Sequence, residues 1–160
     1  RHFLQRGRLA LVFLKSPQPD KLKSINVGGA MAVSSIKAVL ACDVQKVWET
    51  VTSREDYAWR SDLSRIESLN EREFIEYTVD GVATRFRTTA IEPCKRWEFD
   101  MENSRMRGHW AGIFTAREGH TEIVFTETVT AKNLLLRPFV RAYLKKQQAC
   151  YVSDLKKALL

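Results

Sequence analysis

The order of hydrophobic patterns along the chain indicates an α+β fold. Residues 32–42 are rich in small and β-branched side chains, which is typical of a strand. Over 44–52, hydrophobic residues recur at helical spacing directly after Asp43, a residue suited to cap a helix. A second short helix is expected over 55–61. About six strands joined by tight turns should follow.

The last predicted element is an amphipathic helix from Asn133 to Leu159, with Pro138 tolerated in its first turns. Gln147 and Gln148 interrupt its hydrophobic stripe. That stripe consists of Leu136, Val140, Leu144, Tyr151, Leu155 and Ala158. A long antiparallel sheet must bury one face, and this helix is the only late element able to cover it. A curved sheet wrapped around a helix is therefore expected, with a ligand cavity between them.

The first long hairpin turns at 92–95, and its register separates two chemical classes of side chain. The predicted pairs on one face are Ala90 with Trp97, Thr88 with Phe99, and Phe86 with Met101. The predicted pairs on the other face are Arg87 with Asp100, and Arg85 with Glu102. The apolar face should point inward, and the charged ladder should face solvent.

The next hairpin turns at Glu118–Gly119, where glycine supplies the positive φ that a tight turn needs. The predicted pairs are Phe114 with Ile123, Gly112 with Phe125, and Trp110 with Glu127. With Met101 and Met106 flanking the intervening loop, Trp97 and Trp110 would be cross-strand neighbours, and one inner layer would contain Ala90, Trp97, Trp110 and Glu127. Ile113 and Val124 fall on the outer face. Either another part of the protein covers them, or a β-bulge changes which side chains of the strand face inward.

Charge is concentrated at the start of the 160-residue chain. Residues 1–30 contain six Lys or Arg and one Asp, which is +5 of the net charge of +7. The remainder, predicted to be one domain over 31–160, is nearly neutral, so a phosphate-tracking groove and nucleic-acid binding are not expected. The leader is either an extension outside the domain or a basic amphipathic surface anchor. Its apolar run over 9–14 is too short to span a bilayer.

Cysteine usage argues against a disulfide framework or a zinc site. Cys42, Cys94 and Cys150 are odd in number, far apart and without Cys-x-x-Cys spacing, so a reduced, cytoplasmic protein is expected. The three histidines are expected at separate places, which gives no Ser-His-Asp arrangement. No metal or cofactor is predicted, and the oligomeric state is left open.

Several spaced motifs resemble the START-like, or SRPBCC, superfamily, in particular its polyketide cyclase/dehydrase branch. They are Asp43-x-x-x-Val47-Trp48, Tyr57-x-Trp59, Glu92-Pro93 before Trp97, Gly108-x-Trp110-x-Gly112-x-Phe114 and Gly119-x-Thr121-x-Ile123. The likeness extends from about Ala32 to Leu159. It implies the helix-grip fold, a seven-stranded curved antiparallel sheet around the C-terminal helix. Members bind lipids, polyketides, sterols or related molecules, and a minority catalyse cyclisation or dehydration.

Glu127 is the sharpest polar candidate, because the register aims it inward beside Trp110. Desolvation there would raise the pKa of its carboxyl and suit it to acid–base chemistry or to anchoring a ligand. Two alternatives remain: a bulge turns it outward, or Tyr143 or Gln147 satisfies it. Tyr77 is a further candidate donor.

Trp59 and Arg60 follow the short helical segment where the family's cavity opens. Trp59 is expected to line the entrance. Arg60 would either hold an anionic head group or form a surface pair with Asp62.

The function predicted from these residues is non-catalytic binding of a hydrophobic or amphipathic small molecule. The candidate ligand-binding residues are Trp59, Tyr77, Phe86, Trp97, Phe99, Trp110, Phe114, Phe125, Glu127, Tyr143 and Gln147. The alternative is a polyketide cyclase or dehydrase with Glu127 as general acid or base. A third possibility is an adaptor module, which an exposed apolar patch around Ile113 and Val124 would favour.

Overall fold

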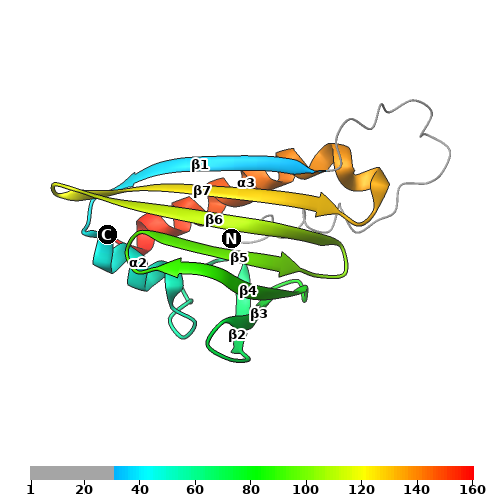
Figure 1. The fold of residues 1–160 in the computed structure, drawn as a ribbon, viewed down its shortest axis with the longest axis horizontal. Helices are drawn as coiled ribbons and strands as arrows, with labels where there is room; N and C mark the ends of the chain where they lie inside the picture. The colour runs from blue at the N-terminus through cyan, green and yellow to red at the C-terminus, as the bar shows by residue number, and fades with distance from the viewer. Residues whose placement is uncertain (1–30) are drawn as a thin grey trace, which may run out of the picture.

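Seven antiparallel strands form one curved sheet, and a long helix lies across one face of it (Figure 1). The computed structural model describes residues 31–160, so the leader lies outside the described residues. The elements in chain order are β1 (Ala32–Leu40), α2 (Val44–Thr52), β2 (Leu63–Ser68), β3 (Glu73–Thr78), β4 (Ala83–Glu92), β5 (Arg96–Glu102), β6 (Met106–Arg117), β7 (His120–Ala131), the 3₁₀ helix η2 (Leu134–Leu136) and α3 (Arg137–Ala158). The predicted seven-stranded sheet with a long C-terminal helix is confirmed.

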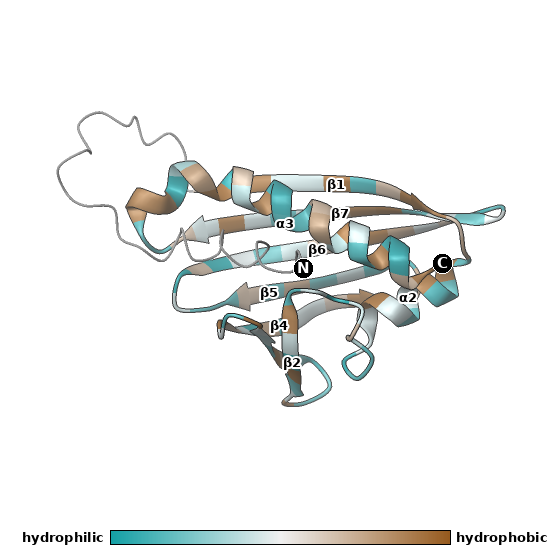
Figure 2. Cartoon of the chain, turned by 180° about the vertical axis from the view of Figure 1, so that it is seen from behind, coloured by the Kyte–Doolittle hydropathy of each residue, from teal (hydrophilic) through white to brown (hydrophobic). Residues whose placement is uncertain are grey.

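The strand order is β1-β7-β6-β5-β4-β3-β2, so β1 joins the last strand while the others form a meander. The helix α3 packs chiefly on β1 and β7. Seen from behind, α3 crosses the sheet toward α2, and β2 lies at the far edge (Figure 2). The helix thus covers one side of the inner face more closely than the other. No helix within 31–160 has the length and apolar character needed to cross a membrane.

The helix α2 forms as predicted, but the second short helix expected over 55–61 was wrong. The Asp43 side chain caps α2 by accepting a hydrogen bond from the Lys46 N–H. After α2, the Ser53 hydroxyl accepts hydrogen bonds from the Glu55 and Asp56 N–H groups, which holds the chain in turns. Side-chain bonds of this kind compete with helical backbone bonds.

The predicted register of the β6–β7 hairpin is confirmed from Trp110–Glu127 to Phe114–Ile123. The β4–β5 register is confirmed only as far as Thr88. A bulge between Thr88 and Ala90 then shifts it by one residue, so Trp97 lies opposite Ile91 and not Ala90.

The expected pairing of Trp97 with Trp110 was also wrong, because Trp97 lies opposite Gly112 and Phe99 lies opposite Trp110. The difference arises in the β5–β6 turn. There the Asn103 side-chain carbonyl accepts hydrogen bonds from the Arg105 and Met106 N–H groups and sets the turn length.

The inner face is arranged in rows that cross the sheet. The row that contains Glu127 reads, from β4 to β1, Thr88, Phe99, Trp110, Glu127 and Ser34. Glu127 therefore points inward as predicted, between an indole ring and the buried Ser34.

One face of α3 is packed against the sheet. The fully packed face contains Val140, Leu144, Gln148, Val152 and Leu155. Gln148 was expected to interrupt this stripe but belongs to it. The Ser34 hydroxyl donates to Gln148 Oε1 at 2.8 Å, and Gln148 Nε2 donates to the Ser34 carbonyl at 2.9 Å. These bonds fix α3 against β1.

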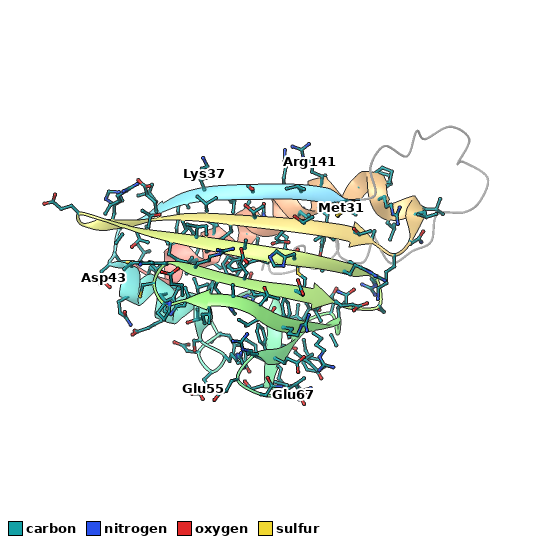
Figure 3. All side chains as sticks on the ribbon, viewed as in Figure 1. Met31, Lys37, Asp43, Glu55, Glu67 and Arg141 are labelled. Carbon is teal, nitrogen blue, oxygen red and sulfur yellow. The ribbon has the colours of Figure 1, made fainter. Side chains whose placement is uncertain are left out.

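The outer face carries charged side chains, among them Lys37 on β1 and Glu67 on β2 (Figure 3). Ile113 and Val124 do lie there, opposite each other, and Ile113 is 40% exposed. The same row places Arg96 beside Ile113 and Lys37 beside Val124. Along that row the apolar pair is bounded by two cations, and it does not extend into the patch that an adaptor surface would need.

Candidate functional site

Aromatic rings cover the inner face of β3 to β7 and contact one another. Phe74 stacks on Phe86 with centroids 4.9 Å apart, and Phe99 stacks on Trp110 at 4.8 Å. Trp97 contacts Phe99 edge-on at 4.9 Å. Six aromatic residues expected to line a cavity thus form one continuous aromatic surface with Phe74, which was not predicted. This surface is here called the aromatic floor: Phe74, Phe86, Trp97, Phe99, Trp110, Phe114 and Phe125.

Part of the aromatic floor is less completely buried than the layer under α3. Phe86, Trp97, Phe99 and Trp110 each keep 8% exposure, whereas Leu155 keeps none. Because α3 packs chiefly on β1 and β7, the floor over β4 to β6 is the part of the inner face that this helix covers least.

Glu127 lies at the border of the aromatic floor, half-buried beside Trp110. Burial raises the pKa of its carboxyl to about 7, and the nearby Arg60 only partly opposes this. None of the described residues donates a hydrogen bond to this carboxyl, and Gln147 does not satisfy it. A poorly solvated carboxyl next to a flat aromatic surface can accept or donate a hydrogen bond near neutral pH.

Arg60 forms a partly buried ion cluster with two carboxylates. Its Nη1 donates to Glu76 Oε1 at 2.7 Å, and its Nη2 donates to Asp62 Oδ2 at 2.8 Å. Burial alone would lower the pKa of Arg60, but the two carboxylates outweigh it and place that pKa above its ordinary value. Burial raises the pKa of Glu76, which Arg60 offsets only in part. The Arg60 pair with Asp62 was anticipated, but Glu76 and the burial were not.

Tyr151 and Trp59 join this cluster to the floor. The Tyr151 ring contacts Trp59 at 5.3 Å and Phe125 at 6.0 Å, and the Arg60 guanidinium lies 5.1 Å from its centroid. Trp59 Nε1 is buried without an acceptor, the one side-chain polar atom in that condition among residues 31–160. An unsatisfied buried donor is costly, and a ligand oxygen could satisfy it.

The α3 face toward this cluster carries Tyr143, Gln147 and Tyr151 at intervals of four residues, which places them on one side of the helix. Burial raises the pKa of Tyr143, and the nearby acids Asp80 and Glu127 add to that effect. Gln147 is half-buried between the two tyrosines.

Tyr77 does not join the other candidates. Its hydroxyl donates to Glu67 at 3.0 Å and the Arg65 guanidinium covers its ring at 4.0 Å, both on the solvent side of the β2–β3 hairpin. Sequence reasoning missed Glu76. Glu76 lies two residues after Phe74 on β3, so the two side chains share a face of the sheet. Predicting the strand register of β3 would therefore have placed Glu76 inward.

A separate hollow of about 720 Å³ lies between β1 and the start of α3. It is lined by Met31, Ala32, Val33, Ser34, Ser35, Val129, Ala131, Arg137, Pro138, Val140, Arg141 and Lys145. None of the predicted ligand-binding residues lines it. Within residues 31–160, no group of three or more His, Cys, Asp or Glu side chains could hold a metal ion.

Comparison with known proteins assigns this architecture to a family. The family model described as polyketide cyclase/dehydrase and lipid transport matches residues 31–159. No curated protein matches the sequence.

Solved structures share the fold at low sequence identity. A START superfamily protein from Mycobacterium smegmatis is 10% identical with a TM-score of 0.72, covering 82% of this chain and 97% of its own. The Zhui aromatase/cyclase from Streptomyces sp. R1128 is 11% identical with a TM-score of 0.72, covering 81% and 93%. An uncharacterised protein from Rhizobium leguminosarum is 19% identical with a TM-score of 0.63, covering 81% and 94%.

Proposed function

Since this chain belongs to the polyketide cyclase/dehydrase and lipid transport family, we propose that it binds an amphipathic small molecule between the aromatic floor and α3. The apolar body of the ligand would lie on Phe99 and Trp110, and its polar group would reach Glu127. The observation that carries this proposal is the Glu127 carboxyl, poorly solvated beside Trp110 and without a hydrogen bond from the described residues.

The chemistry around Glu127 favours a ligand whose polar group is neutral. Arg60 is already held by Glu76 and Asp62, so this cation is not free to pair with a ligand carboxylate beside Glu127. A hydroxyl could bond to Glu127, and a carbonyl could accept from Trp59 Nε1. Hydroxylated polycyclic ketones have both groups on a flat apolar body. Their affinity would come from burying apolar surface at roughly 25 cal/mol per Å².

A direct test uses dihydroxyanthraquinone as the probe, titrated into the full-length chain and followed by tryptophan fluorescence quenching. Trp110→Ala and Glu127→Gln should each weaken binding, whereas Arg87→Ala on the outer face should not. Anthraquinone carboxylate should bind more weakly than the neutral probe. Equal affinity of the Trp110→Ala and Arg87→Ala variants would contradict the proposal. Native mass spectrometry of protein purified from its own host would then identify a co-purifying ligand.

A second candidate function is cyclisation or dehydration of a polyketide-like substrate, and the Glu127 pKa of about 7 favours it. A carboxyl of that pKa could take a proton from carbon next to a carbonyl and return it to a departing hydroxyl, releasing water. Turnover that follows a bell-shaped pH profile and is lost in Glu127→Gln would establish catalysis. Unchanged turnover in that variant would exclude Glu127 as the acid or base. The expected cytoplasmic location stays a prediction.

A further inference from the structure

Hydrophobic side chains are exposed together where β7 leads into α3. Leu134 is 56% exposed, Leu135 is 43% exposed and Phe139 is 52% exposed. Leu134 and Leu135 belong to η2, and Phe139 lies in the first turn of α3. These three residues are called the apolar ridge below. The η2 turn is fixed by the Asn133 side chain, which accepts a hydrogen bond from the Leu135 N–H, so the leucines are held outward by local structure.

The segment that carries the apolar ridge is basic, and one of its cations, Lys132, pairs with Glu102 at 2.9 Å. From Ala131 to Ala149 the chain contains five Lys or Arg and no Asp or Glu. Arg137, Arg141 and Lys145 recur at intervals of four, which places them along one side of α3, where they line the hollow beside β1. Figure 3 places Arg141 and Met31 toward this end of the molecule and Asp43 at the other.

The apolar ridge is continuous with the proposed ligand site. Phe139, Tyr143, Gln147 and Tyr151 follow one another at intervals of four along α3, from the exposed end to the Arg60 cluster. Tyr143 lies within electrostatic reach of Glu127 at the inner end and of Asp80 and Arg105 in the strand turns at the outer end. This side of α3 therefore connects the exposed end of the molecule with the aromatic floor.

We propose that this end docks on an anionic lipid bilayer. The apolar ridge enters the boundary between headgroups and acyl chains, and Arg137, Arg141 and Lys145 contact the headgroup phosphates. Charge complementarity selects this partner, because exposed apolar side chains bordered by more cations than acids match a negatively charged apolar surface. Docking itself does not depend on which molecule is bound. Only transfer of a ligand between the bilayer and Glu127 rests on the proposed function.

The test is co-sedimentation of the full chain with vesicles of phosphatidylcholine alone and of equal parts phosphatidylcholine and phosphatidylglycerol. Tighter binding to the mixed vesicles is expected, and it should weaken with salt. Leu134→Ser/Leu135→Ser should reduce that affinity about tenfold, because two exposed leucines no longer enter the bilayer. Arg141→Gln/Lys145→Gln should reduce it roughly twentyfold.

The matched control is Val39→Ser/Ile91→Ser, which removes two hydrophobic residues away from the ridge that are at least as exposed on average as the two leucines, at 58% and 55%. This variant should bind vesicles like the unmodified chain. All variants should keep their binding of dihydroxyanthraquinone in the absence of vesicles, which separates docking from ligand binding.

Three results would overturn the docking proposal. The first is no preference of the unmodified chain for mixed vesicles. The second is unchanged binding by Leu134→Ser/Leu135→Ser, since attachment would then come from another part of the chain. The third is self-association that this variant abolishes without any vesicle binding, because the ridge would then be a contact between copies of the chain.

Discussion

The indole ring of Trp110 lies directly over Gly112, two residues further along the same face of β6. A Cβ atom at Gly112 would lie 2.2 Å from Cη2 of that ring and 2.7 Å from Cζ3. Because glycine has no side chain, the indole can lie against the strand, where it stacks on Phe99 and contacts Phe125 at 4.9 Å. Gly112 therefore determines how the ring of Trp110, the residue opposite Glu127, lies in the aromatic floor.

Gly112→Ala should destabilise the fold by about 1–3 kcal/mol, because the methyl group forces the Trp110 ring away from Phe99. Dihydroxyanthraquinone binding should weaken in parallel. The measurement is urea unfolding followed by far-UV circular dichroism, together with the fluorescence titration. In a Trp110→Phe background the same change should cost less, because phenylalanine lacks the distal ring atoms that clash. An equal cost in both backgrounds would show that the strain lies elsewhere.

Much of the fold could be predicted because period-two and helical patterns are local signals. The β6–β7 register followed from the turn at Gly119 and placed Trp110 opposite Glu127. The resemblance to the START-like superfamily is likewise confirmed by the family match over residues 31–159. The bulge after Thr88 could not be predicted, because an inserted residue changes the pairing without changing the composition of the strand.

The candidate site was less accessible to sequence reasoning, because it depends on which side of α3 meets which strand. Gln147 and Gln148 are adjacent in the sequence, yet only Gln148 reaches Ser34 on β1. The contacts of Arg60 with Glu76 join segments sixteen residues apart, and no short motif encodes them. Glu127 could be placed because a single hairpin register decides its direction.

Stability should depend on pH through Glu127. Its pKa is about 7 in the folded protein, against an ordinary value of 4.5. The unfolded chain therefore releases this proton at lower pH than the folded chain. The stability that the protonated Glu127 carboxyl contributes is present at low pH and is lost as pH rises through about 7. The full effect would be up to about 3 kcal/mol.

Glu127→Gln should remove this dependence, so its free energy of unfolding should exceed that of the unmodified protein by more at pH 8 than at pH 5. Urea unfolding across that pH range measures the difference. Glu118→Gln, at the exposed β6–β7 turn, is the matched control and should leave the profile unchanged. A difference between the Glu127→Gln variant and the unmodified protein that stays constant with pH would refute the raised pKa.

Arg60 should be the most sensitive charged residue of the cluster. Arg60→Met leaves the buried Glu76 carboxylate without its cation and should cost about 3–5 kcal/mol. Adding Glu76→Gln should recover part of that loss, because the second change removes the uncompensated charge. Unfolding free energies of the two variants measure the recovery. A double variant less stable than Arg60→Met alone would contradict this account.

The stability of the protein should respond differently to replacement of Trp59 and of Trp97 by phenylalanine, because only one of their indole N–H groups has an acceptor. Trp97 Nε1 donates to Thr88 Oγ1 at 3.1 Å inside the core, so Trp97→Phe should cost about 1–3 kcal/mol. Trp59 Nε1 is buried without an acceptor, so Trp59→Phe removes an unsatisfied donor along with some packing and should change stability by less than about 1 kcal/mol.

The Trp59→Phe variant should nevertheless bind dihydroxyanthraquinone more weakly, because the carbonyl of the probe loses its donor. Thermal unfolding and the fluorescence titration check both properties in one preparation. A large stability loss in Trp59→Phe with unchanged probe affinity would mean that this indole is a packing element and not part of the ligand site.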